Sequence, residues 1–245
     1  MKKIQSFTVR MVFLFVLIQF SGCQKFIDKI LPGHTHNDYT GCRIKHITGQ
    51  LYEDVIATVE YNEANNPISL TYNKEKAYLL YPRYMFYDSK NRLIEYKVMY
   101  DANSVIEDHR YGYSGDRIIA DTNTITFTGY SVVLSTFEYD SKGRIVVVTQ
   151  KLIDGEGDPD SRGTINYKYD SNDNRILGDE YIYDNKVNFR RTNKVWMFIM
   201  RNYSQNNLQG ATDYNEHGLP VRFENSKDYL FFDIGPLISI DYECQ

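Results

Sequence analysis

A turn signature that recurs along the chain constrains its fold more than any other feature. Most copies have a tyrosine followed by Asp or Asn, a few polar residues, and then an apolar residue that is often preceded by Arg. The side chain of the Asp or Asn can accept hydrogen bonds from backbone N–H groups two residues further on, which starts a turn. A later Gly or Asn takes the position where a hairpin needs a positive φ. Each copy therefore predicts a β-hairpin, and the clearest copies are Tyr87-Asp88 with Asn91, Tyr139-Asp140 with Gly143, Tyr169-Asp170 with Asn174, and Tyr214-Asn215 with Gly218.

The spacing of the copies predicts the topology. Tyr87, Tyr100 and Tyr113 follow one another at intervals of 13 residues, and the other intervals lie near 13 or twice that number. The spacing therefore predicts an all-β, up-and-down antiparallel meander of about 14 to 16 strands. A long open meander would leave two exposed edges, so we expect the sheet to be curled or closed into a barrel.

One apolar segment does not alternate as the others do. Val195-Trp196-Met197-Phe198-Ile199-Met200 is apolar at every position, whereas a strand with one wet face would alternate. We interpret this segment as a strand that is covered on both faces or lies at a contact with a partner. We expect no helix between Cys42 and the carboxyl terminus.

The amino terminus has the organisation of an export signal. A basic stretch over residues 1–10 precedes an apolar run over residues 11–18, which is far shorter than the roughly 20 residues of a membrane-spanning helix. The Ser21-Gly22-Cys23 that follows resembles the lipobox of bacterial lipoproteins. The resemblance implies that the signal is cut before Cys23 and that the Cys23 thiol receives a diacylglycerol. The alternative is ordinary signal cleavage nearby, which would leave a soluble periplasmic protein. Because Gln24 rather than Asp follows the cysteine, the resemblance implies that the protein is attached to the outer membrane. It does not distinguish between the two leaflets.

These features divide the chain into three parts. Residues 1–22 are the signal peptide, residues 23–40 are a lipidated tether, and residues 41–245 are a single β-meander domain. Removal of the signal leaves 25 basic and 32 acidic residues, because it takes away three basic residues and no acidic one, so the formal net charge becomes −7. An acidic balance opposes binding to nucleic acid through a basic face. We expect the membrane to be reached through the lipid instead.

Two cysteines remain once Cys23 is assigned to the lipid. Cys42 begins the first expected strand on the face of Ile44, and Cys244 ends the last one on the face of Ile240. In a closed barrel with an even strand count, these two strands would run antiparallel side by side, and an exported protein meets oxidising conditions. We therefore predict a Cys42–Cys244 disulfide; two buried free thiols are the alternative.

The repeats also resemble known families. The Tyr139–Ile145 unit is similar to the YD (RHS) repeats of bacterial surface and toxin-shell proteins, which form β-meander walls. The lipobox, the Cys42-Arg43-Ile44 opening, the Tyr-Asp hairpins and the short last strand resemble a family of bacterial lipoprotein domains of unknown function with a described porin-like fold. This second resemblance spans about residues 40 to 245. It implies an architecture and brings no catalytic residues.

Three clusters could carry metal or acid–base chemistry. The His34-Thr35-His36 segment with Asp38 offers metal ligands, but it lies in the expected tether, where fixed geometry is hard to build. Carboxylates alternate over residues 154–160 as in calcium loops, but Pro159 breaks the EF-hand pattern, so we interpret this segment as an acidic hairpin loop. Glu107-Asp108-His109-Arg110 could act as an acid–base cluster, but neighbours on a strand point to opposite faces. We therefore expect no catalytic residue, no metal and no cofactor.

Because we expect no catalytic residue, metal or cofactor, a binding or structural role comes before an enzymatic one among three hypotheses. The first is a non-enzymatic envelope lipoprotein that binds a glycan or an envelope protein partner, using some of the 22 tyrosines. The second is a purely structural module for envelope assembly, and the third is a carbohydrate-active enzyme. The oligomeric state is left open by the sequence.

Overall fold

The computed structural model describes residues 41–244, apart from residues 53, 75–79, 128, 157–162, 179–180 and 229. The expected signal peptide, the tether with Cys23 and the His34–Asp38 segment lie outside the described residues, as does most of the acidic loop over residues 154–160. No described helix is long and apolar enough to cross a membrane. The strands are β1 Cys42–Gly49, β2 Ala57–Tyr61, β3 Pro67–Tyr72, β4 Arg83–Tyr87, β5 Leu93–Asp101, β6 Ser104–Ser114, β7 Arg117–Ile125, β8 Ser131–Tyr139, β9 Ile145–Gly155, β10 Thr164–Asn166, β11 Tyr183–Val187, β12 Asn206–Leu208, β13 Ala211–Tyr214, β14 Pro220–Phe223 and β15 Leu237–Cys244; the helices are the 3-10 helices η3 Phe189–Thr192 and η4 Phe232–Ile234 and the α-helix α2 Lys194–Ile199.

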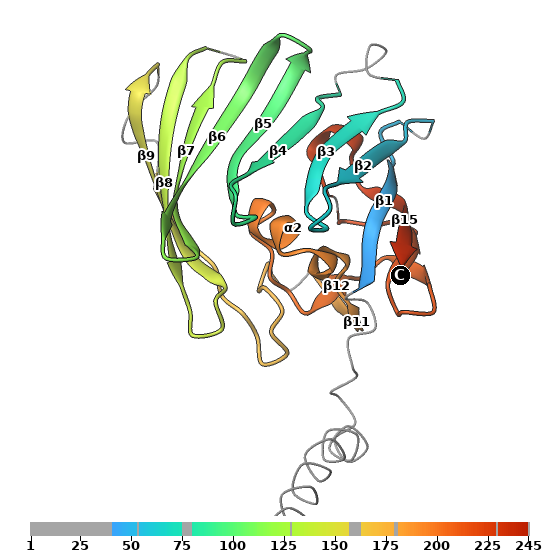
Figure 1. Cartoon of the computed structure of the whole chain (residues 1–245). Coiled ribbons are helices and arrows are strands. Elements are labelled where there is room, and N and C mark those ends of the chain that lie inside the picture. The colour runs from blue at the N-terminus through green and yellow to red at the C-terminus, as the bar shows by residue number, and fades with distance from the viewer. Residues whose placement is uncertain are drawn as a thin grey trace, which may run out of the picture. The chain divides into compact units, whose positions relative to one another are not determined.

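Thirteen of these strands form one antiparallel sheet in the order β10-β9-β8-β7-β6-β5-β4-β3-β2-β1-β15-β14-β13. The first ten are consecutive in the chain, so the predicted all-β meander is confirmed. The sheet is strongly curled (Figure 1). Strands β11 and β12 form a separate two-stranded sheet.

Of the two expected arrangements, the sheet is curled and not closed into a barrel, because the described sheet ends at β10 on one side and at β13 on the other. After β10 the chain leaves the sheet, and α2 lies on its concave side (Figure 1). Buried residues of this segment, Phe189 and Trp196 among them, join the core formed by the inner face of the sheet. The segment after β10 thus fills part of the interior. The two edge strands are only three and four residues long, and short edges limit unwanted pairing.

The apolar segment over residues 195–200 is helical, which corrects the prediction of a strand and of a domain without helices. Asn193 caps α2, since its side chain accepts a hydrogen bond from the Val195 backbone N–H at 2.9 Å. Trp196 is fully buried. Val195 is buried as well, and Phe198, Ile199 and Met200 pack against the core while partly exposed. A short helix with contacts on most of its sides needs apolar residues at nearly every position, which is the pattern that we interpreted as a doubly covered strand.

The turns of the repeat are built as predicted. Asp140 Oδ1 accepts the backbone N–H groups of Lys142 at 2.9 Å and Arg144 at 3.0 Å, and Gly143 has a φ of 75°. The turns that begin at Asp88, Asp170 and Asn215 show the same pair of hydrogen bonds.

One turn position was assigned wrongly. The residue with positive φ in the third turn is Asp173 at 64°, and not Asn174. The Asp170 copy has one residue more before its Arg than the Asp140 copy has. The turn keeps its length, so Asn174 lies just after it, where its side chain donates a hydrogen bond to Asn206 Oδ1 at 3.0 Å.

The tyrosine of each repeat ties one hairpin to the next. Tyr113 donates its hydroxyl hydrogen to the Leu93 carbonyl at 2.8 Å, and Tyr139 donates to the Ile118 carbonyl at 2.6 Å. An arginine from the preceding turn lies over each ring, with Arg92 4.6 Å from the centroid of Tyr113. The repeat therefore encodes contacts between neighbouring hairpins as well as the turns themselves.

We expect Gly143→Ala to lower the free energy of unfolding by about 1 to 2 kcal/mol, because an L-residue at positive φ is strained. No neighbouring atom lies within 4 Å of the added Cβ, so the loss comes from the backbone alone. Urea unfolding measures it. Gly163→Ala is the matched control, since Gly163 has equal space and no positive φ; equal stability loss in both variants would contradict this account.

Candidate functional site

The main candidate site is a cleft of about 980 Å³ on the concave side of the sheet. Inner-face residues of β4 to β7 form one wall, and residues at the end of α2, just after it and around η4 form much of the other. The cleft brings together aromatic rings from both walls: Tyr52, Tyr81, Tyr96, Tyr111, Phe127 and Phe198.

Three aromatic rings form a group at the cleft, and two of them are exposed. The Tyr81 ring lies 5.6 Å from the Phe127 ring and 6.3 Å from the Tyr100 ring, between centroids. Phe127 is 51% exposed and Tyr100 is 54% exposed. Contiguous exposed apolar surface of this kind marks binding sites more often than chance surface does. We call Tyr81, Tyr100 and Phe127 the aromatic rim.

A buried ion pair lies below the rim. Arg83 Nη1 donates to Asp233 Oδ2 at 2.8 Å and to the Tyr72 hydroxyl at 2.7 Å, while Tyr72 donates to Asp233 Oδ2 at 2.8 Å. The Arg83 guanidinium also lies 4.1 Å from the centroid of the Phe231 ring. Burial raises the pKa of Tyr96 to about 12 and raises the pKa of Tyr72 further still. Both phenols therefore stay neutral over the physiological pH range.

A second charged group lies on the inner face of β6 and β7. His109 Nδ1 is 3.0 Å from both carboxylate oxygens of Asp121, and His109 Nε2 is 3.3 Å from Glu107 Oε2. Arg201 Nη2 is 3.7 Å from Asp121 Oδ2. Burial opposes the charged imidazole, but the hydrogen bonds with Asp121 and Glu107 outweigh it and raise the pKa of His109 to about 9. His109 is therefore a cation at neutral pH.

Neighbouring residues of the segment over residues 107–110 point to opposite faces, as expected, but alternate residues share a face. Asp108 and Arg110 pair with each other on the outer face, with Arg110 Nη2 3.3 Å from Asp108 Oδ2. Glu107 and His109 share the inner face because they are two residues apart. Asp121 joins them because β6 and β7 are paired in a register that places Tyr111 opposite it. Asp121 could not be assigned to this group from the sequence, since no local pattern links it to His109.

The geometry of this group does not favour acid–base catalysis by His109. Both ring nitrogens are engaged by carboxylates, so neither is left to take a proton from a substrate. Glu107 and Asp121 lie on opposite sides of the imidazole, which fills the space where a glycosidic bond would have to lie. The Asp121 side chain is also buried.

The charged imidazole makes stability depend on pH. The pKa of His109 is about 9 in the folded protein against an ordinary value of 6.5, so its contribution is complete below about pH 6.5 and is lost as the pH rises through about 9. We expect the free energy of unfolding to fall by about 2 to 3 kcal/mol between these limits. Urea unfolding at several pH values measures this slope. His109→Gln should remove it and His46→Gln should keep it; a slope that persists in His109→Gln would refute the assignment.

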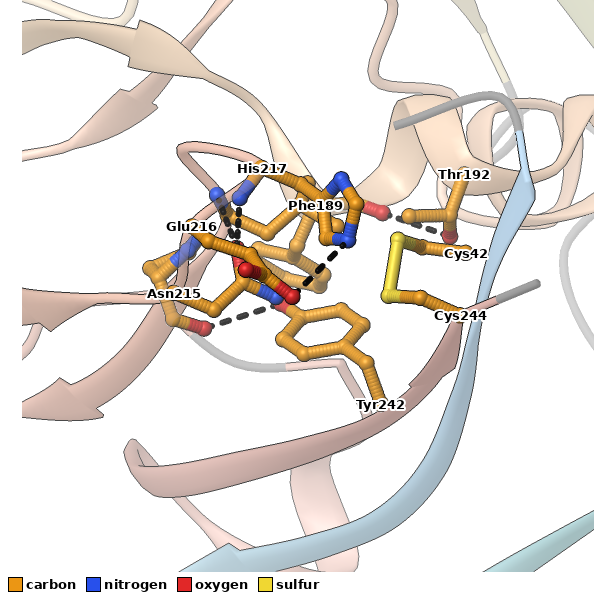
Figure 2. Close-up of a disulfide and its surroundings, with 10 residues drawn as sticks. Cys42, Phe189, Thr192, Asn215, Glu216, His217, Tyr242 and Cys244 are labelled. Carbon is orange, nitrogen blue, oxygen red and sulfur yellow. Dashed lines mark hydrogen bonds and ion pairs between the residues drawn. A yellow bond between two sulfur atoms is a disulfide. The ribbon is translucent and has the colours of Figure 1, made fainter. Parts of the chain in front are cut away.

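The two cysteines predicted to pair form a disulfide, with their Cα atoms 4.0 Å apart (Figure 2). Cys42 and Cys244 are register partners on β1 and β15. The two cysteines lie close together for a different reason from the one expected. Strands β1 and β15 are neighbours inside an open sheet, and they do not meet at the seam of a barrel.

The predicted residues of the repeat stabilise the fold and do not line the cleft. The turn residues of the repeat lie in hairpin turns away from the cleft lining. The repeat tyrosines Tyr87, Tyr139 and Tyr169 donate to backbone carbonyls, and Tyr214 donates to Asp184 Oδ2 at 2.7 Å. The aromatic rim is instead formed by residues outside the clearest repeat copies.

A scan against models of known protein families finds no match to this chain, and a search of curated proteins finds no relative.

Proposed function

We propose that the protein is a cell-envelope lipoprotein whose β-meander domain binds a neutral glycan in the cleft. The observation that carries this proposal is the aromatic rim beside the cleft of about 980 Å³. Flat aromatic faces bury the apolar faces of a ligand, and a few placed polar groups set its orientation. This role fits a non-enzymatic binding scaffold.

The charges of the cleft favour a neutral ligand. Arg83 is paired with Asp233, and His109 is paired with Glu107 and Asp121. A charged ligand would have to compete with these pairs, and breaking a buried pair is costly. Neutral tyrosine hydroxyls next to aromatic faces match a ligand with many hydroxyl groups and no net charge.

The location is proposed from the sequence. The lipobox-like Ser21-Gly22-Cys23 supports acylation at Cys23 and attachment to the outer membrane. The Tyr-Asp hairpins support membership of the lipoprotein family with a porin-like fold. Labelling with radioactive palmitate should mark the wild-type protein and not Cys23→Ser; equal labelling of both would rule out the anchor.

A glycan screen on the purified full chain tests the binding function. We expect neutral oligosaccharides to bind, with affinity that changes little with salt because no ion pair forms with the ligand. Binding restricted to charged ligands, or an absence of glycan binding, would overturn the proposal.

One observation favours the rival function of a structural assembly module. The edge strand β10 is exposed along its length, and Ile165 on it is an exposed large apolar residue. Although it is short, this edge still has unpaired backbone N–H and C=O groups that a strand of another chain can meet. Concentration-dependent self-association without glycan binding would support this rival.

A further inference from the structure

We propose that Cys42, Cys244 and His217 form a masked zinc site, which the disulfide closes and which reduction opens to Zn²⁺. The ligand atoms of these three side chains all lie within 4.8 Å of one another. Two thiolates and an imidazole are the ligands that zinc prefers in tetrahedral sites. We call the three residues the Cys2His group.

The distances suit a metal once the bond between the sulfurs is broken. Ligand atoms around a tetrahedral Zn²⁺ lie about 3.5 to 3.8 Å apart, given bonds of about 2.3 Å to sulfur and about 2.0 Å to nitrogen. The Cα atoms of Cys42 and Cys244 are 4.0 Å apart as register partners. Rotation about χ1 of the two cysteines is therefore sufficient to separate the sulfurs, and the strands can stay paired.

The backbone holds His217 beside the two cysteines. It lies in the turn between β13 and β14, where Asn215 Oδ1 accepts the N–H groups of His217 and Leu219, each at 3.0 Å. Gly218 takes the positive φ of that turn, at 75°. Tyr242 joins the turn to the last strand, since its hydroxyl donates to the Pro220 carbonyl at 2.9 Å. Figure 2 shows His217 directly beside the disulfide.

The surroundings are apolar on one side and open on the other. The rings of Phe189 and Tyr242 lie close to the disulfide (Figure 2), and Cys42 and Phe189 are fully buried. Glu216 is on the open side, with Oε1 3.6 Å from His217 Nε2 and a side chain that is 88% exposed. The fourth position of the metal can therefore be taken by Glu216 or by water.

The chemistry balances with a dithiol as the reductant. The dithiol gives two electrons and two protons to the Cys42–Cys244 bond and becomes a disulfide itself. Zn²⁺ then displaces the two thiol protons, which pass to the solvent, and binds both thiolates and the imidazole. The metal would replace the covalent link between β1 and β15 with a coordinated one.

Titration of the full chain with Zn²⁺ tests the proposal. Cys23→Ser is the background, because it leaves Cys42 and Cys244 as the only thiols. We expect the anaerobically reduced protein to bind one Zn²⁺, and the oxidised protein to bind it at least about 100-fold more weakly, since its sulfurs are no longer thiolates. With Co²⁺ as the probe, the reduced protein should show thiolate-to-cobalt charge-transfer absorption.

Two variants separate this site from binding elsewhere on the surface. His217→Ala should weaken Zn²⁺ binding at least about 10-fold, while His46→Ala, on β1 outside the Cys2His group, should leave it unchanged. Circular dichroism of the reduced protein checks that it is folded, and Zn²⁺ should raise the Tm of the reduced protein only. Equal affinity in the oxidised and reduced proteins, or full affinity in a folded His217→Ala variant, would overturn the proposal.

Discussion

Replacing both Cys42 and Cys244 with serine should lower the free energy of unfolding by about 3 to 5 kcal/mol. The disulfide joins residues that are 202 apart in the sequence. A link across so long a loop removes much conformational freedom from the unfolded chain, and the removed entropy grows with loop length. Unfolding in guanidinium chloride, compared between the double variant and the oxidised wild-type protein, measures the loss.

The matched control for this prediction is Cys23→Ser, which should leave the stability unchanged because Cys23 has no part in the cross-link. The reduced wild-type protein should be as unstable as the double variant. A loss below about 1 kcal/mol would show that the pairing of β1 with β15 holds the two ends together without the bond.

Trp196→Ala should lower the free energy of unfolding by about 3 to 5 kcal/mol. Trp196 is fully buried on α2, and its ring lies 6.4 Å from that of Phe231 in an edge-on arrangement. Removing the indole leaves a cavity between the sheet and the segment that fills its concave side. Urea unfolding measures the loss, with the slope against urea concentration as a check on two-state behaviour.

Phe127→Ala is the control for the tryptophan variant, since Phe127 is 51% exposed. Its stability should change by less than about 0.5 kcal/mol. Similar losses in the two variants would contradict the position of α2 as part of the core.

The meander could be predicted from the sequence because its signals are local. Asp140 and Gly143 determine their own turn, and each turn determines the pairing of the strands beside it. Asn174 was wrongly predicted to have the positive φ because the Asp170 copy has one residue more than the Asp140 copy. That extra residue lies after the turn and not in it. The open sheet could not be predicted in the same way, because closure depends on where the segment after β10 packs.

The helix α2 and the charged group of the cleft depend on contacts between distant residues. The residues around Trp196 are apolar at every position, and this pattern fits a covered strand and a covered helix equally. Asp121 meets His109 only through the register of β6 and β7. The spacing of two residues predicts that Glu107 and His109 share a face. The place of Asp121 beside them depends on how the two strands pair.

The central claim is that the aromatic rim beside the cleft binds a glycan, and the most direct test is a calorimetric titration with the best neutral oligosaccharide from the screen. We expect Tyr81→Ala and Phe127→Ala each to weaken binding at least about 10-fold, as the loss of an aromatic contact at the centre of an interface does. Ile153→Ala is the matched control, because Ile153 is 50% exposed and does not line the cleft, and it should bind as the wild-type protein does. Unchanged affinity in both aromatic variants would contradict the claim.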